Sequence, residues 1–229
     1  ATATDAAGNA TSCSFTVTVN DVEPPKIVTQ ASNRTVECDA GGNTAVLNAW
    51  LASNGGAAAT DNCGSVTWSH NFTVLSDGCG ATGSATVTFT ATDPSGNSVM
   101  TTATFAIVDT TAPKFNVAAA NQTFECDGAG NTASLTSWLA SNGGATAADH
   151  CSQVTWTRNF TTLSDLCGET GSANVTFTAT DACGNSSSTT ATFAIIDTTA
   201  PTLIWKANNV AVDNALIYNI TPNQVPVTI

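Results

Sequence analysis

The stretch Phe89-Thr90-Ala91-Thr92-Asp93-Pro94-Ser95-Gly96-Asn97 decides the fold of this chain. Over residues 86–92 threonine alternates with apolar or small residues, and this period of two indicates a strand with one buried and one solvent-facing side. Residues 93–97 have the composition of a turn, and apolar residues return at every second position over 103–107. We therefore predict a β-hairpin.

The same phrase returns 88 positions later, at Phe177 to Asn185, and the offset holds without a gap from Pro25-Lys26 and Pro113-Lys114 onward. Such a fixed period indicates tandem copies of one structural unit. The sequence thus divides into the C-terminal end of a truncated repeat, two full repeats, and the start of a different or diverged module: residues 1–23, 24–111, 112–199 and 200–229.

One segment of each repeat departs from the strand pattern. Residues 43–52 place four apolar side chains at helical spacing, namely Val46, Leu47, Trp50 and Leu51. Asn43 or Thr44 is a suitable N-cap, and Gly55-Gly56 is a suitable stop. We predict a short amphipathic helix inserted over one end or edge of a sandwich. Trp50 and its equivalent Trp138 are interpreted as core anchors, and ligand binding is the alternative.

The charge balance argues against nucleic acid as a partner. The 229 residues carry a net charge of −12, and the five basic residues are scattered, so no basic stripe exists to neutralise phosphates. No apolar run approaches the roughly 20 residues of a membrane-spanning helix. The opening residues 1–9 do not form a signal peptide, so we expect export signals and anchors to lie outside this sequence.

The hairpin phrase, followed by an alternating strand and then Asp-Thr-Thr-Ala-Pro at 109–113 and 197–201, resembles the hyalin-repeat (HYR) family. It is most similar to the long cysteine-containing version in giant surface adhesins of Bacteroidota, including gliding adhesins. The resemblance implies an immunoglobulin-like sandwich, export to the cell surface, and a role in adhesion or matrix. The predicted fold class is all-β: tandem immunoglobulin-like β-sandwich repeats, each with a short helical insert.

Eight cysteines in an exported chain argue for disulfides. In the immunoglobulin-like topology that the resemblance implies, the four cysteines of the second repeat lie two at each pole. We therefore predict three bonds, Cys38–Cys79, Cys126–Cys167 and Cys151–Cys183. Cys63 is then free, because Ser95 stands where a cysteine would pair with it, and Cys13 is expected to pair upstream. A zinc site is the alternative, but no CxxC pair supports it.

No catalytic site is predicted. His70 aligns with Arg158 and His150 with Asn62, so chemistry shared by the repeats cannot use a histidine. Triads, nucleophile elbows and phosphate loops are absent from the sequence. Paired carboxylates are the ingredients of a glycosidase, but these recur in turns and linkers, which fits structure better than a unique active site. We expect no enzyme.

Acidic residues are predicted to converge where one repeat meets the next. Asp109 should meet the second repeat's loop and turn, and Asp21, with Glu23, should meet those of the first. The candidate ligands for Ca²⁺, the expected cofactor, are Asp21, Asp61, Asp93, Asp109, Asp149, Asp181, Asn185 and Asp197. The alternative is that each Asp caps its own turn. The family resemblance also suggests O-linked sugars at Thr110 and Thr198.

The leading functional hypothesis is a structural or adhesive stalk segment of a large secreted, cell-surface protein, since tandem repeats with short linkers act as spacers. The alternatives are a glycan- or ligand-binding accessory module and a self-assembling extracellular filament subunit. The expected partners are neighbouring repeats of the same chain, surface glycans or other cells, and further copies of the chain, with no membrane span in this part of the protein.

Overall fold

The computed structural model describes residues 1–39, 41–164, 166 and 168–201. The chain divides into two compact units, Ala1–Ile196 and Asp197–Ile229, and the helices and strands named below belong to the first. The module predicted at 200–229 lies outside the described residues from position 202 onward. Within the described part of the chain, no helix is long and apolar enough to cross a membrane.

The two full repeats contain the same elements in the same order. The first has β3 (Lys26–Thr29), β4 (Arg34–Glu37), α1 (Thr44–Ala52), the 3-10 helix η1 (Asn54–Gly56), β5 (Ala58–Thr60), β6 (Thr67–His70), β7 (Gly83–Thr92) and β8 (Ser98–Val108). The second has β9 (Lys114–Val117), β10 (Gln122–Glu125), α2 (Thr132–Ala140), η2 (Asn142–Gly144), β11 (Thr146–Ala148), β12 (Thr155–Arg158), β13 (Gly171–Thr180) and β14 (Ser186–Ile196). A separate hairpin precedes them, formed by β1 (Thr2–Thr4) and β2 (Ala10–Ser12).

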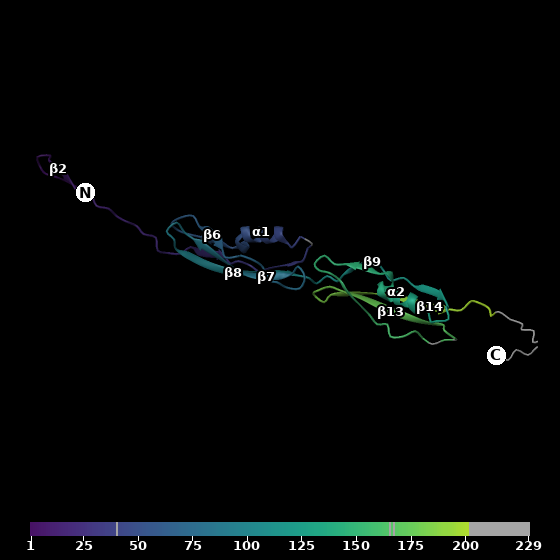
Figure 1. Cartoon of the computed structure of the whole chain (residues 1–229). Helices are drawn as coiled ribbons and strands as arrows, with labels where there is room; N and C mark the ends of the chain where they lie inside the picture. Colours follow the sequence, from purple (N-terminus) through teal and green to yellow (C-terminus); the bar gives the residue numbers. More distant parts are fainter. Residues whose placement is uncertain (40, 165, 167, 202–229) are drawn as a thin grey trace, which may run out of the picture. The chain divides into compact units, whose positions relative to one another are not determined.

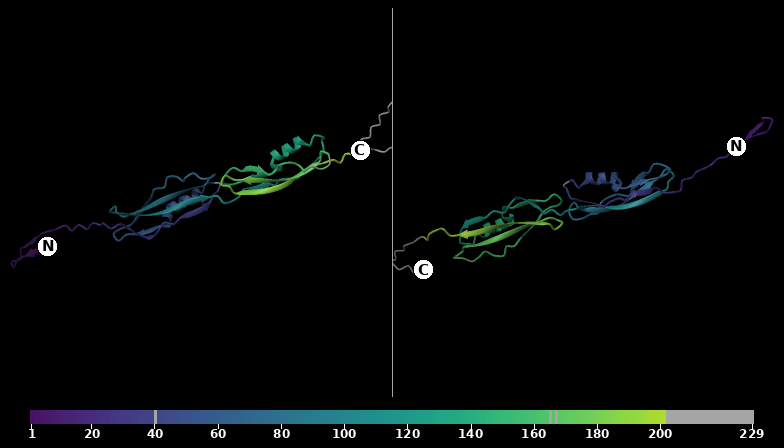
Figure 2. Two further views of the ribbon diagram at one scale, coloured as in Figure 1. Left: turned by 90° about the horizontal axis from the view of Figure 1, so that it is seen from below. Right: turned by 180° about the vertical axis from the view of Figure 1, so that it is seen from behind.

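Each full repeat is a two-layered sandwich (Figures 1 and 2). One layer of the first repeat is a four-stranded sheet in the order β4-β8-β7-β6, in which β4 runs parallel to β8 and the other pairs are antiparallel. The β3-β5 pair and α1 form the other layer, and the second repeat has the same arrangement, with sheets β10-β14-β13-β12 and β9-β11. The predicted all-β class of tandem immunoglobulin-like repeats with a helical insert is confirmed.

The core of each repeat follows from the alternation along the predicted hairpin. β7 and β8 pair antiparallel over their whole length, which confirms the hairpin. Phe89 of β7 and Phe105 of β8 are fully buried, as are their equivalents Phe177 and Phe193. The intervening residues on these strands are mostly threonine and alanine and are only partly covered. One face of the hairpin therefore forms the core, because its phenylalanine side chains both point to that face.

The helix at Thr44–Ala52 is confirmed, but its predicted position over an end or edge of the sandwich is wrong. Trp50 lies edge-on to Phe89, with ring centroids 5.3 Å apart, so α1 covers the face of the four-stranded sheet. Its indole N–H donates to the carbonyl oxygen of Ser32 at 3.1 Å. Trp50 is 4% exposed, which confirms its role as a core anchor. A face position buries this ring more completely than an edge position would.

Asn43 occupies the predicted N-cap position, but its side chain does not cap the helix. Asn43 precedes α1 but lies in the left-handed region, with φ of 55°, and makes no capping hydrogen bond from its side chain. Its amide instead donates to the carbonyl oxygen of Glu37 at 2.9 Å, and its Oδ1 accepts from the backbone N–H of Asp39. Asn43 therefore closes the loop between β4 and α1, and Asn131 makes the equivalent bonds in the second repeat.

Candidate functional site

The short linker that follows β8 is held at both of its sides. The side-chain amide of Asn185, in the β13–β14 turn, donates to the carbonyl oxygen of Asp109 at 3.0 Å. Asn97 makes the same bond to Asp21 at 3.2 Å where the chain enters the first repeat. We call this end of each repeat, with its turn and the loop after β5 or β11, the N-terminal pole. The chain is therefore anchored to each repeat before its first strand begins.

Glu37 holds the linker from the side of the first repeat. Its carboxylate accepts from the backbone N–H of Thr110 at 2.7 Å, the Thr110 hydroxyl at 3.0 Å and the Thr111 hydroxyl at 2.8 Å. The hydrogen bond from the Thr110 backbone, followed by that from the Thr111 hydroxyl, lowers the pKa of the Glu37 carboxyl. Thr110 is exposed, and its predicted O-glycosylation stays a prediction, as does that of Thr198.

The turn carboxylates are largely satisfied by their own turns. Oδ1 of Asp181 accepts from the backbone N–H groups of Cys183 and Asn185, and Oδ2 accepts from the Asn185 amide at 2.8 Å. Asp93 makes the corresponding bonds to Asn97. At these positions the structure favours the turn-capping alternative. Asn185 also turns an N–H donor, and not an oxygen, toward the Asp109 carbonyl, which is unfavourable for a cation ligand.

A carboxylate pair recurs at the N-terminal pole of each repeat. Ligand atoms of Asp109, Asp149 and Cys151 lie within 4.8 Å of one another, and so do those of Asp21, Asp61 and Cys63. Asp109 is 8% exposed, and its Oδ1 accepts from the backbone N–H of Thr111 at 3.2 Å. Burial raises the pKa of the Asp109 carboxyl, and the negative charges of Asp149, Asp181 and Glu37 add to the rise. The predicted meeting of Asp109 with Asp149 is thus observed.

The remaining predicted ligand, Asp197, lies in the described part of the second unit. Its Oδ1 accepts from the backbone N–H of Thr199 at 3.0 Å, as Oδ1 of Asp109 does from Thr111. The loop and turn that Asp197 would meet by analogy belong to residues beyond 201, which are outside the described chain. Its role as a ligand therefore stays a prediction.

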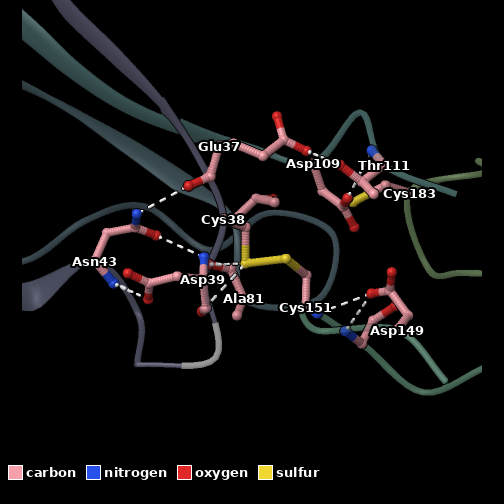
Figure 3. The surroundings of a disulfide bond; sticks show 12 residues. Glu37, Cys38, Asp39, Asn43, Ala81, Asp109, Thr111, Asp149, Cys151 and Cys183 are labelled. Atoms are coloured by element: carbon pink, nitrogen blue, oxygen red, sulfur yellow. Dashed lines mark hydrogen bonds between the residues drawn. A yellow bond between two sulfur atoms is a disulfide. The ribbon is translucent and has the colours of Figure 1, made fainter. Parts of the chain in front are cut away.

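The disulfides join consecutive repeats, and this corrects two predicted pairs. Figure 3 shows the surroundings of one of them, Cys38–Cys151. Cys38 bonds to Cys151 and Cys79 bonds to Cys183, with Cα atoms 5.9 Å and 5.1 Å apart. Cys38–Cys79 and Cys151–Cys183 are therefore wrong. The prediction placed two cysteines at each pole but looked for partners within one repeat, whereas the C-terminal pole of the first repeat contacts the N-terminal pole of the second.

Backbone contacts at this junction bring the cysteines together. The N–H of Ala81 donates to the carbonyl oxygen of Cys151 at 2.9 Å. Cys38 and Cys151 are each 8% exposed, so this bridge is buried. The prediction for Asp109 already assumed that the poles abut, and applying the same assumption to the cysteines would have given these partners.

The other cysteines remain unbridged among the described residues. Cys63 has no disulfide partner within the described chain, in agreement with the prediction, and its side chain is exposed. Partial desolvation of the sulfur, followed by the negative charges of Asp21 and Asp61, raises the pKa of its thiol. Cys126 has no disulfide partner within the described chain, and its predicted partner Cys167 lies outside the described residues. Cys13 is likewise free and exposed, so its predicted upstream partner is untested.

No family model matches this chain, and no curated protein matches it. It is similar to a structure of Drosophila N-cadherin EC1-4, at 13% identity and a TM-score of 0.29, over 62% of this chain and 44% of that one. Mouse cadherin-23 EC22-24 matches at 11% identity and a TM-score of 0.28, over 76% of this chain and 67% of that one. Tandem Ig repeats of Dlar match at 14% identity and a TM-score of 0.22, over 77% and 100%. Scores this low assign neither a family nor a function.

Proposed function

We propose that this chain is a structural and adhesive stalk segment of a large secreted, cell-surface protein, in which tandem repeats act as a stiff spacer. The observation that carries the proposal is the pair of disulfides between consecutive repeats, Cys38–Cys151 and Cys79–Cys183. Disulfides form and persist in oxidising, extracellular compartments. Covalent bonds between domains restrict their relative motion, which suits a stiff spacer.

The two bridges act together with the linker. A linker alone leaves neighbouring domains free to move, which is the usual behaviour of domains joined by a small interface. Here the linker is bound by Glu37 on one side and by Asn185 on the other. The bridges add two covalent connections at separate points of the same junction. The linker and the two bridges together should restrict motion between the repeats more than the linker alone would.

The proposed spacer is calcium-binding and HYR-like. Oxygen ligands gathered at each N-terminal pole support the calcium part, and the repeated Phe-Thr-Ala-Thr-Asp phrase supports the family part. We place it in a surface adhesin of the Bacteroidota gliding type, with glycans or other cells as the adhesive partners and O-linked sugars at Thr110 and Thr198. Intact mass of the native chain tests the sugars, because a mass matching the bare sequence would exclude them.

The proposal is for a non-enzymatic protein without a dedicated ligand groove. His70 packs against the ring of Phe89, and its equivalent in the second repeat is Arg158. Trp50 and Trp138 lie in the two cores, so neither forms the exposed aromatic platform that a glycan-binding module uses. Self-assembly into a filament is the remaining alternative, and concentration-dependent association would favour it.

Small-angle scattering of the full chain tests the spacer. The oxidised chain should give one maximum dimension at all concentrations, and reduction with alkylation should broaden the distance distribution because the junction is freed. The control is Cys63→Ser, which removes a free thiol and leaves both bridges intact. Identical scattering of oxidised and reduced chains would reject the disulfide-stiffened spacer, and growth of the particle with concentration would support the filament alternative.

A further inference from the structure

Two unpartnered oxygen atoms occupy the same position of successive repeats. Among the described residues, the buried side-chain oxygens that lack a hydrogen-bond partner are Oδ2 of Asp21 and Oδ2 of Asp109. These residues are 88 positions apart, which is the repeat period. Each precedes the first strand of its repeat and is tied down through its backbone carbonyl by an asparagine.

Such an atom requires an explanation. A buried carboxylate oxygen without a partner loses its hydration and gains nothing in return, and native proteins leave few groups in this state. Asp109 is more than nine-tenths buried, so solvent does not supply the missing contact. The same orphan in two copies whose surrounding residues differ, with Glu23 at the position of Thr111, indicates a feature of the repeat and not an accident of one site.

Each unpartnered oxygen belongs to a carboxylate that lies close to a second one. Asp149 presents an oxygen within 4.8 Å of Asp109, and Asp61 does so for Asp21. In both loops the facing aspartate uses Oδ1 to accept a backbone N–H, from Cys151 at 2.8 Å and from Cys63 at 2.8 Å. The loop is thereby fixed with its carboxylate at the N-terminal pole. Two like charges held this close repel one another unless a cation or a proton lies between them.

We propose that each N-terminal pole binds one Ca²⁺ ion between its two carboxylates, Asp109 with Asp149 in the second repeat and Asp21 with Asp61 in the first. This inference rests on the calcium-binding spacer proposed above and names the atoms of its sites. Ca²⁺ takes 6–8 oxygen ligands, so backbone oxygens or waters complete the shell. With two carboxylates the affinity belongs to the weak extracellular range, a Kd of about 10⁻⁴–10⁻³ M.

The neighbouring sulfur atoms favour a hard cation over zinc. Cys151 is in a disulfide and cannot act as a thiolate ligand. Cys63 stands at the equivalent position of the first repeat, so a thiolate ligand could serve only one of the two poles. Only oxygen ligands are therefore common to both poles. The bound ion would connect the linker that precedes a repeat to the loop after the third strand of that repeat, β5 or β11. It would thereby hold the linker against the repeat that follows it.

Equilibrium dialysis of the oxidised full chain against CaCl₂ tests the sites. Asp109→Asn and Asp149→Asn should each remove one equivalent of bound Ca²⁺ relative to the wild type, and Asp21→Asn should remove a different one. Asp77→Asn is the matched control, since it removes the same charge from an exposed position outside both pairs. Asp109→Asn combined with Asp21→Asn should remove both equivalents.

Failure of the inference is distinct from failure of the spacer. Unchanged stoichiometry in Asp109→Asn, or no binding by the wild type at millimolar Ca²⁺, would overturn the sites whatever the scattering shows. Circular dichroism identifies a variant that fails to fold, and the half-buried Asp149 then provides the test at the same pole. If Asp149→Asn loses one equivalent of bound Ca²⁺ while the scattering profile of the wild type is the same with and without Ca²⁺, the site is established. Such a site does not stiffen the chain.

Discussion

Trp138 lies edge-on to Phe177, with ring centroids 5.2 Å apart and an interplanar angle of 78°. Trp50 has the same relationship to Phe89, so this contact is part of the repeat unit. The indole N–H of Trp138 also donates to the carbonyl oxygen of Ala120 at 3.1 Å. One side chain thus connects α2, the four-stranded sheet and the segment after β9. Trp138 therefore holds the helical insert to the sandwich, together with the buried Leu139.

Trp138→Ala is expected to destabilise the chain by about 3–5 kcal/mol, because it leaves a large cavity in the second core and an unpaired carbonyl. Urea unfolding followed by circular dichroism gives the change in the free energy of unfolding. Phe15→Ala is the control, since Phe15 is 78% exposed and its truncation should change stability by less than about 0.5 kcal/mol. Similar effects of the two substitutions would contradict the core role of Trp138.

Gly143→Ala and Gly144→Ala separate a steric clash from backbone strain. Both glycines have positive φ, 68° and 83°, so both substitutions strain the backbone. A Cβ at Gly143 would lie 2.9 Å from Cε2 of Phe177, whereas a Cβ at Gly144 meets nothing within 4 Å. We expect both variants to lower the melting temperature, with the larger decrease for Gly143→Ala. Equal decreases would show that Phe177 moves aside without cost.

Peptide mapping without reduction should recover Cys38 linked to Cys151 and Cys79 linked to Cys183. Removing one bridge as Cys38→Ser with Cys151→Ser should cost about 2–4 kcal/mol of unfolding free energy, because a long loop is released in the unfolded chain. Cys63→Ser should leave stability unchanged. A peptide that links Cys38 to Cys79 would refute the pairing across the junction.

Stability should depend on pH through Asp109. Because folding raises the pKa of its carboxyl above the ordinary 3.8, the folded state holds this proton more tightly than the unfolded chain does. The contribution of Asp109 is therefore most favourable below pH 3.8 and is lost as pH rises through the folded pKa. With chelator at neutral pH, Asp109→Asn should melt above the wild type, and this difference should vanish in acid.

Calcium should reverse that order. Binding to the folded wild type raises its melting temperature by mass action, whereas Asp109→Asn lacks the anionic ligand and gains less. Differential scanning calorimetry at neutral pH, with chelator and then with millimolar CaCl₂, measures both effects. Glu37→Gln provides the contrasting case. Hydrogen bonds from the linker lower the pKa of Glu37, so its ionised form is expected to stabilise the fold increasingly as pH rises from acid, and the variant should lose that gain. If the melting temperatures of the wild type and Asp109→Asn keep the same order with chelator and with CaCl₂, the site at Asp109 is contradicted.

The fold was predictable because it depends on local periodicity. The period of two around Phe89 and the helical spacing around Trp50 each specify one buried side, so hairpin and helix follow from sequence alone. The position of α1 in the sandwich was not predictable. The spacing of apolar residues shows which side of a helix is apolar, but not which surface of the protein that side covers. The left-handed conformation of Asn43 was also not predicted. Asparagine is common both in that conformation and as a residue whose side chain caps a helix, and sequence does not distinguish the two roles.

For the candidate site, sequence predicted which carboxylates meet but not which groups each of them binds. Repetition of Asp109, Asp149 and Asp181 indicated that they converge, and the structure brings the first two together. For Asp181 the turn-capping alternative was the right one, but sequence could not choose it, since the choice depends on the orientation of the Asn185 amide. Partner choice among cysteines likewise depends on which pole meets which, a property of the junction and not of either repeat.

The bridges between the repeats also limit how far the chain can be drawn out. Tension between Cys38 and Cys183 would run along two parallel paths, residues 151–183 after the first bridge and residues 38–79 before the second. The shorter path, residues 151–183, sets the limit. At about 3.5 Å per residue this gives an extension on the order of 110 Å, against about 500 Å for the same span without bridges. Even with both cores unfolded, most of the contour length would stay out of the line of force. Such a tether yields little under load and keeps its ends close enough to refold when the load is released.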